Sequence, residues 1–346
     1  WFTINIRRYL DMMQQILLGL GGGGAPVFVD DVFKTKLYTG TAAYGLAVTT
    51  GLDYTSGESL IWTKRRIRND SYNFDHILTN TGRGRKWLVS NKTDGENTTP
   101  VVLSLTSTGY TLDNSSTVNK SGDSYVSWNF KESPGFLDIV QFTGNGSSGL
   151  RSINHDLKST PAFIIARLAT GGSQWYCWHK DLTSKNHYIL LNGAGAEGNA
   201  GAQVWDATDT TFSIHSGVVG NTNNSEYIAY LFADEDARFG TNSNESIIKC
   251  GIFPSSETTT VDMGFEPGWI LLKGKDSNSN WAIFDSTRGF GTSSSASSKA
   301  KRLSADLSGP EYENAGFWIE SGTPNIIRTN GNFSTSNFIY VCISKP

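Results

Sequence analysis

The side chains that could perform chemistry are few and scattered in this sequence. Its 346 residues include five histidines, and none stands near a carboxylate or a cysteine at the spacing of a metal site. No G-x-S-x-G pattern marks a nucleophilic serine. Most acidic residues stand singly in polar turns, although Asp262, Glu266 and Asp285 could converge near the end of the chain. The sequence therefore predicts a protein that is not an enzyme, with no catalytic, cofactor-binding or metal-ligating residues.

Tryptophans are the best candidates for contact with a ligand. The C–H faces of a sugar stack on a flat aromatic ring, while its hydroxyls meet neighbouring amide groups. Five tryptophans that we expect to be exposed are therefore candidate glycan contacts: Trp87, Trp175, Trp178, Trp205 and Trp318. The same residue type also builds the cores of β-sandwiches, and alternation assigns Trp128, Trp269 and Trp281 to the core.

An acidic loop at residues 234–245 offers oxygen ligands. Asp234, Glu235, Asp236 and Glu245 are joined there by asparagines, but not in the order of an EF-hand. A solvated loop is the simpler interpretation. Calcium binding by this loop is left open.

The charge of the chain argues against nucleic acid as a partner. The net charge is −3 and the isoelectric point is about 6.0, so no broad basic surface is expected. One dense basic cluster occurs at residues 64–68. We interpret it as the solvated end of a strand, with a polyanion site as the alternative.

The composition indicates turn-rich β structure. Hydrophobic residues make up 38% of the chain, aromatic residues 12% and charged residues only 18%. No apolar run approaches the roughly 18 residues of a membrane span. The three cysteines, Cys177, Cys250 and Cys342, are too few and too scattered for a disulfide framework. Cys250 and Cys342 lie in apolar alternating runs, so we expect them to be buried thiols.

Two aromatic-rich blocks recur in the same order and position the candidate residues. The first occurs at residues 60–64, 163–167 and 269–273, and the second at residues 125–130, 227–232 and 338–343. Each block alternates like a strand, and the copies lie roughly a hundred residues apart. His179 stands where the other copies have Asn80 and Asp285, and such a variable position indicates a turn or cap.

The repeats predict an all-β fold of three diverged, tandem β-sandwich or jelly-roll units, with a short N-terminal helical arm. We place the units at residues 25–135, 136–246 and 247–346, after an arm and glycine hinge at residues 1–24. The apolar stripe of the arm follows helical spacing: Ile6, Leu10, Met13, Leu17 and Leu20. Such a stripe needs a cover, either the protein's own flank or a sister subunit.

Seven segments carry a family pattern, at residues 13–21, 26–33, 118–128, 134–140, 142–146, 264–269 and 285–289. With the repeats, they resemble virion structural proteins of tailed phages, especially marine and cyanobacterial ones. The likeness runs over nearly the whole chain from Met13.

That resemblance implies a non-enzymatic tail-, fibre- or capsid-associated protein of the virion, without catalytic residues or cofactors. It implies that the arm attaches to other virion proteins or to sister subunits of a homo-oligomer, with the β-units projecting outward. A receptor-binding, lectin-like adhesin for host surface glycans and a polysaccharide depolymerase are the alternatives. The sequence leaves the place in the virion and the oligomeric state open.

Overall fold

The computed structural model describes residues 27–67, 74–255, 259–293, 299–314, 316–320, 322–323, 325–329 and 336–346. The N-terminal arm, with the predicted stripe from Ile6 to Leu20, lies outside these residues, so its helix stays a prediction. The described chain is nearly all β, with two four-residue helices, α2 (Val29–Val32) and α3 (Ser116–Asn119). No helix in this part of the chain is long and apolar enough to cross a membrane.

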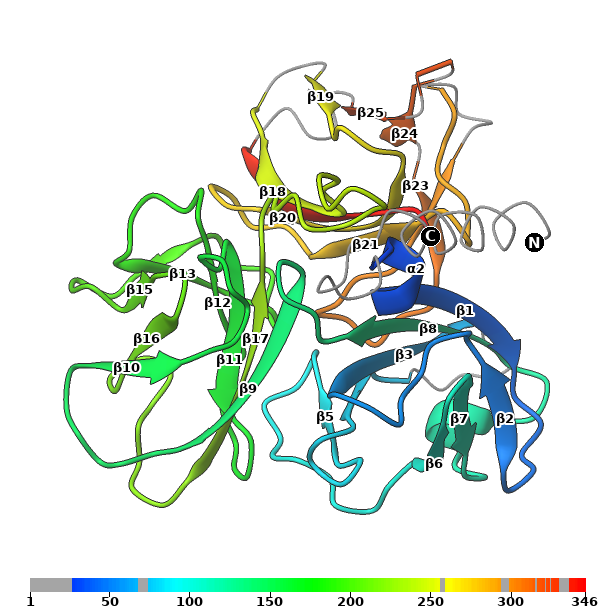
Figure 1. Cartoon of the computed structure of the whole chain (residues 1–346), viewed down its shortest axis with the longest axis horizontal. Coiled ribbons are helices and arrows are strands. Elements are labelled where there is room, and N and C mark those ends of the chain that lie inside the picture. Colours follow the sequence, from blue (N-terminus) through cyan, green and yellow to red (C-terminus); the bar gives the residue numbers. More distant parts are fainter. Residues whose placement is uncertain are drawn as a thin grey trace, which may run out of the picture.

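Three large antiparallel sheets form the body (Figure 1), and we call residues 27–135, 136–246 and 247–346 units 1, 2 and 3. The sheet of unit 1 has the order β1 (Phe33–Thr39), β8 (Ser124–Lys131), β3 (Ser59–Ile67), β4 (Ile77–Asn80), β5 (Trp87–Val89). That of unit 2 has the order β9 (Leu137–Thr143), β17 (Glu226–Phe232), β11 (Phe163–Leu168), β12 (Tyr176–His179), β13 (His187–Leu190), β14 (Gly198–Asn199). That of unit 3 has the order β18 (Ile248–Phe253), β26 (Phe338–Ser344), β20 (Pro267–Gly274), β21 (Ala282–Asp285).

The order of connection is the same in all three sheets. The first strand of each unit pairs with its last long strand, which pairs with the strand of the first sequence block. Each large sheet takes all its strands from one of the predicted ranges. The descent of the three ranges from one repeated unit stays a prediction.

A three-stranded sheet covers the outer face of each large sheet. Unit 1 uses β2 (Leu46–Thr49), β7 (Gly109–Leu112) and β6 (Val102–Thr106); unit 2 uses β10 (Leu150–Asn154), β16 (Thr211–His215) and β15 (Trp205–Ala207); unit 3 uses β19 (Thr259–Asp262), β25 (Ile326–Thr329) and β24 (Phe317–Ile319). Unit 3 also has the pair β22 (Ala300–Arg302) and β23 (Tyr312–Asn314). In unit 1, Val48 and Tyr110 pack against Ile61 of the large sheet. The predicted all-β fold of sandwich units is therefore confirmed.

The inner faces of the large sheets share one core at the centre of the molecule. Val126, Trp128 and Phe130 alternate on the inner face of β8, as their spacing predicted, and belong to this core. The ring of Phe130 lies 6.1 Å from that of Phe232 in unit 2 and 5.3 Å from that of Trp269 in unit 3, between centroids. The units are thus packed together around a common aromatic centre (Figure 1).

The predicted burial of Cys250 and Cys342 is confirmed. Cys177, Cys250 and Cys342 are buried free thiols. Burial raises the pKa of Cys177 and Cys250 well above the ordinary thiol value. These cysteines pack as small apolar side chains.

Candidate functional site

Buried cations occupy one matching position in each unit. These cations are Lys64, Arg167 and Lys273. The residue four positions before each of them pairs with a residue near the end of the last long strand of its unit. The pairs are Leu60 with Phe130, Phe163 with Phe232, and Trp269 with Ile343. The three cations are at most 1% exposed. Because a buried charge is costly without partners, the contacts of these side chains indicate what they do.

Each cation reaches across to another unit. Arg167 in unit 2 donates from Nη2 to the carbonyl oxygens of Thr93 (3.1 Å) and Asp94 (2.6 Å) in unit 1. Lys273 in unit 3 donates from Nζ to the carbonyl of Ala194 in unit 2 at 3.0 Å. Lys64 in unit 1 donates from Nζ to the carbonyl of Ser308 in unit 3 at 3.2 Å. The cation contacts run from unit 2 to unit 1, from unit 3 to unit 2 and from unit 1 to unit 3. The three units therefore form a closed ring.

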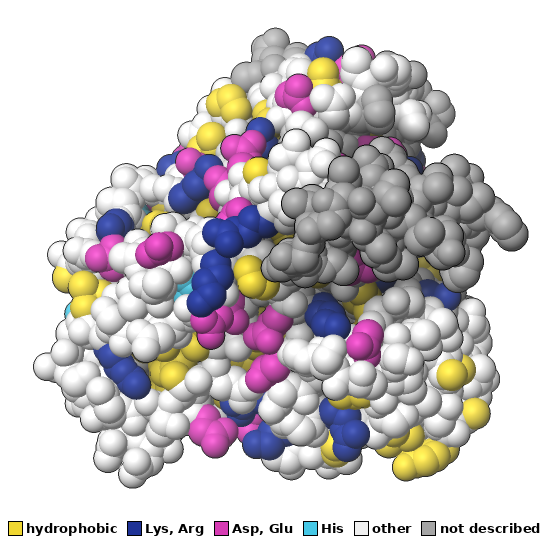
Figure 2. Space-filling model, in the orientation of Figure 1, with side chains coloured by type: hydrophobic (Ala, Val, Ile, Leu, Met, Phe, Trp, Pro, Cys, Tyr) yellow, Lys and Arg dark blue, Asp and Glu magenta, His cyan; other side chains and the backbone are white. Residues whose placement is uncertain are grey.

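We call the three contact regions seam 1–2, seam 2–3 and seam 3–1. In Figure 2, Lys, Arg, Asp and Glu side chains gather where the lobes meet, whereas the outer ends of the lobes are mostly uncharged. On the face drawn, charged groups thus cluster along the joints between units, and further ion pairs lie on the outer parts, such as Lys185 with Asp206 of unit 2.

A ring nitrogen forms a second tie at two of the seams. Trp175 Nε1 donates to the carbonyl of Val89 across seam 1–2, and Trp281 Nε1 donates to that of Leu190 across seam 2–3, both at 2.8 Å. The matching residue at seam 3–1 is His76, whose Nδ1 accepts from Trp62 Nε1 at 2.9 Å. Burial, with the nearby Lys64 charge, lowers the pKa of His76 well below its ordinary value, so the ring is neutral at pH 7.

A glutamate forms a third tie at every seam. The backbone N–H groups of Glu96, Glu197 and Glu311 donate to the carbonyls of Ala169, Lys275 and Arg66 respectively, each at 2.8 Å. The carboxylates are held as well. Glu96 pairs with Arg83 and Lys86, and Glu197 with Thr183 and Lys275. The backbone bond of the glutamate and the cation-to-carbonyl bond thus recur at all three seams, whereas the partners of the glutamate carboxylates differ.

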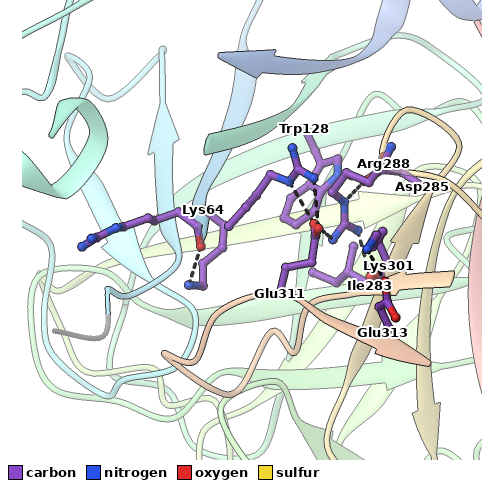
Figure 3. A network of polar contacts seen from close by, with 10 residues as sticks. Lys64, Trp128, Ile283, Asp285, Arg288, Lys301, Glu311 and Glu313 are labelled. Atoms are coloured by element: carbon purple, nitrogen blue, oxygen red, sulfur yellow. Dashed lines mark hydrogen bonds and ion pairs between the residues drawn. The ribbon is translucent and has the colours of Figure 1, made fainter. Parts of the chain in front are cut away.

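Seam 3–1 carries an additional buried ionic network (Figure 3). Glu311 accepts from Arg66 Nε and Nη2 at 2.9 Å and from Arg288 Nη1 at 3.2 Å. Arg288 Nε also donates to Asp285 Oδ2 at 2.5 Å. That oxygen accepts from Trp128 Nε1 of unit 1 at 2.8 Å. A continuous chain of charge-assisted hydrogen bonds therefore joins β3 and β8 of unit 1 to β21 of unit 3.

Desolvation lowers the pKa of all three seam cations. Burial lowers the pKa of Lys64 to about 7, that of Lys273 to about 8 and that of Arg167 to about 10. Perturbed groups of this kind often mark catalytic sites. Here their nitrogen atoms contact backbone carbonyls of neighbouring units, so the arrangement supplies cohesion between units.

The structure corrects the glycan candidates. Trp175 and Trp205 are fully buried, and Trp178 and Trp318 are nearly so, which leaves no ring face for a sugar. The expectation that these four are exposed is wrong. Three of them belong to the central core, and Trp318, on β24 of the outer sheet of unit 3, is also covered. Trp87 alone of the five is half-buried, and its Nε1 donates to the carbonyl of Thr99 at 2.9 Å.

The interpretation of residues 64–68 as a solvated strand end is also wrong. Lys64 lies in seam 3–1, and Arg66 pairs with Glu311. Arg65 is 3% exposed and its Nη2 lies 2.6 Å from Asp123. Arg68 lies outside the described residues. The three described cations of this cluster are engaged within the protein, which disfavours the polyanion alternative.

The acidic loop at residues 234–245 uses its first carboxylates in ion pairs. Asp234 pairs with Lys180 at 2.5 Å, Glu235 with Lys249 at 2.8 Å and Asp236 with Arg238 at 2.7 Å. In the part of the chain that the structure describes, no three His, Cys, Asp or Glu side chains gather as metal ligands.

The variable position at Asn80, His179 and Asp285 is a cap, as predicted. Asn80 Oδ1 and Asp285 Oδ1 accept from the N–H three residues on, and His179 Nδ1 accepts from the N–H of Asp181. The acidic residues of unit 3 have separate partners: Asp285 pairs with Arg288, Asp262 accepts from Asn325, and Glu266 pairs with Lys345.

The seam residues are what reasoning from the sequence missed. Lys64, Arg167 and Lys273 end the three copies of one sequence block, so their shared charge was a visible signal. Trp175 also matches Trp281, which alternation had assigned to the core. The glutamates gave no such signal, because the loops before them differ in length.

A cavity lies where the described chain begins and ends. It has a volume of about 600 Å³ and is lined by residues 28–30, 240–247, 264–265 and 344–346, except for 242 and 243. The carbonyl of Val27 accepts from Gly240 N–H at 3.0 Å, and Ser344 N–H donates to Ile247 at 2.8 Å. The entry and exit of the chain are thus fixed at one place.

Fold and seams together define an all-β protein whose three sandwich units close into a ring through matching buried contacts. The chain belongs to the DUF7483 family, described as a domain of unknown function, whose model matches residues 29–346. That match begins at the first residue of α2. No curated protein matches the sequence.

Proposed function

We propose that this protein is a non-catalytic structural protein of a virion, attached through its N-terminal arm and carrying its three units outward. Its partners are other virion proteins and sister subunits. The observation that carries the proposal is the use of charged groups at the seams. Lys64, Arg167 and Lys273, the side chains with the chemistry of an active site, are directed at carbonyls of neighbouring units.

Rigidity is the physical property that this arrangement supplies. Buried polar networks stabilise one geometry, because any displacement leaves a desolvated group without its partner. A structural component of a particle has to keep its parts in a fixed relation under load. The resemblance of the sequence to virion proteins of tailed phages supports the same function.

The position of the arm supports attachment at one end of the molecule. Residues 1–26 join the body at Val27, beside Gly240 and the last residues of the chain. A partner that holds the arm is therefore tethered to the body at this end. The outer sheets of units 1 and 2, labelled β6, β7, β10, β15 and β16 in Figure 1, lie away from it.

Particle assembly with arm variants tests the proposal. Particles are assembled with the full chain, with a chain lacking residues 1–24, or with Leu10→Asp and Leu17→Asp together. The matched control is Gln14→Asp with Gln15→Asp, which adds the same charge off the stripe. We expect loss of incorporation for the first two variants and retention for the control. Incorporation of the truncated chain at the level of the full chain would refute the proposal.

A further inference from the structure

The cavity at the chain ends has a mixed surface with a distinct apolar part. Val29 and Phe265 are half-buried and line it, and Ile247 and Pro346 contribute further apolar atoms. Val29 packs against the central core and Phe265 against the core of unit 3. The cavity therefore lies where the start of unit 1, the end of unit 2 and unit 3 meet, and two of its lining side chains pack against the cores.

The chain itself brings an apolar segment to this place. Residues 1–26 precede Val27, which is hydrogen-bonded to Gly240 at the cavity. Six residues lie between Leu20 and Val27, and these seven residue-to-residue steps can span roughly 23 Å when extended. Gly21 to Gly24 allow backbone conformations that other residues rarely adopt, so the chain can reverse direction there. The stripe of the arm is thus within reach of the cavity.

Tethering favours the chain's own arm over that of another molecule. A short flexible connection keeps the arm at an effective local concentration on the order of millimolar. A second copy would have to match that concentration in solution. The stripe also needs a cover, since an apolar helix face left in water is unfavourable.

We propose that this cavity binds the apolar stripe of the same chain's N-terminal arm, with Leu17 and Leu20 packing beside Phe265. The inference rests on the proposed function, in which the arm is the attachment element. It adds that the unassembled protein keeps the stripe covered against its own body.

A disulfide trap in the full-length chain tests the contact. The variant carries Leu17→Cys with Phe265→Cys, and the control carries Leu17→Cys with Leu150→Cys, an exposed position on β10 of unit 2. The native cysteines are buried and do not compete. Under mild oxidation we expect a disulfide within one molecule, formed about tenfold or more faster than in the control. Equal rates, or disulfide-linked dimers as the main product, would overturn the proposal.

The accessibility of a thiol at position 265 provides a second measurement, which needs no cysteine in the arm. In chains with Phe265→Cys, the rate of reaction with a soluble thiol reagent is compared after two changes. Leu17→Asp with Leu20→Asp should raise that rate several-fold, whereas Gln14→Asp with Gln15→Asp should leave it unchanged. The same rate in both variants would contradict a stripe seated in the cavity. Near-ultraviolet circular dichroism checks that the body is folded in each.

These outcomes are separable from those of the assembly experiment. If the trap fails while removal of residues 1–24 abolishes incorporation, the arm is an attachment element without a seat in this cavity. If the trap forms and the truncated chain still joins particles, the seat exists and the proposed function is wrong.

Discussion

Seam 1–2 and seam 3–1 use matching positions of their units, but the chain crosses only the first of them covalently. Units 1 and 2 are consecutive in the chain, so β8 leads directly to β9 across seam 1–2. Units 3 and 1 are joined by no peptide bond, and only side chains and loops hold that seam together. Seam 3–1 is the one at which the ring closes.

The ion pairs that cross the two seams differ in burial. Arg83 reaches Glu226 across seam 1–2, and the Glu226 side chain is 51% exposed. Arg66 reaches Glu311 across seam 3–1, where the two side chains are 15% and 6% exposed. An exposed pair contributes little to stability, whereas loss of one partner of a buried pair is strongly destabilising. The joint without a covalent link thus has the contacts that tolerate least displacement.

Removal of the central carboxylate should give the largest contrast between the seams. Glu311→Gln leaves Arg66 without the carboxylate it pairs with and removes one of the two carboxylates that Arg288 contacts, and we expect a loss of about 3 to 5 kcal/mol in the free energy of unfolding. Glu226→Gln, the matched change at seam 1–2, should cost less than about 1 kcal/mol. Urea denaturation of both variants measures the difference. Losses of similar size would show that burial does not distinguish the two seams.

Removal of the indole ties should affect two seams alike. Trp175→Phe and Trp281→Phe each remove the donor from a carbonyl at a seam, that of Val89 or Leu190, at a cost of about 1 to 3 kcal/mol. Both hydrogen bonds are 2.8 Å long and start from matching positions. The two losses in the free energy of unfolding should therefore agree within about 1 kcal/mol. Thermal and urea unfolding measure them. A much smaller loss for one variant would break the equivalence of the seams.

The titration of Lys64 should contribute to the pH dependence of the free energy of unfolding. Burial holds its pKa at about 7 in the folded protein, below its ordinary value of 10.5. Between these pH values the unfolded chain binds more protons, so Lys64 makes the free energy of unfolding rise with pH, by up to about 1.4 kcal/mol per pH unit. Below pH 7 the folded and unfolded states are both protonated at this group, and its slope vanishes.

The variant Lys64→Met lacks this titration. The free energy of unfolding of the unmodified protein minus that of the variant should therefore increase from pH 7 toward pH 10 and stay level below pH 7. Lys273→Met, with a folded pKa of about 8 at its lysine, should show the rise beginning about one pH unit higher. Denaturant titrations across this range test both. A difference independent of pH would mean that the ammonium groups are solvated.

Alternation was enough to predict the strands and their inner faces. Val126, Trp128 and Phe130 face the centre because side chains of a strand alternate with a period of two residues. The same pattern could not predict burial of the opposite face. Ser127 and Asn129 look exposed in the sequence, yet both are buried under the outer sheet, where Tyr110 Oη donates to Ser127 Oγ at 2.9 Å. The error on Trp175, Trp178, Trp205 and Trp318 has the same origin, since a cover supplied from elsewhere in the chain leaves no local pattern.

The sequence by itself determined the β class and the strand faces, because both follow from short-range periodicity. The matching positions of Lys64, Arg167 and Lys273 follow from the recurrence of one sequence block along the chain. Only the tertiary structure decided what those cations do. The partner of Lys64 lies 244 residues away at Ser308, and that of Arg167 lies 74 residues away at Thr93. Both partners are backbone carbonyls, which every residue possesses. A contact to a group common to all residues has no signature in the sequence. Which carbonyl each cation contacts is therefore decided by how the three units pack into a ring.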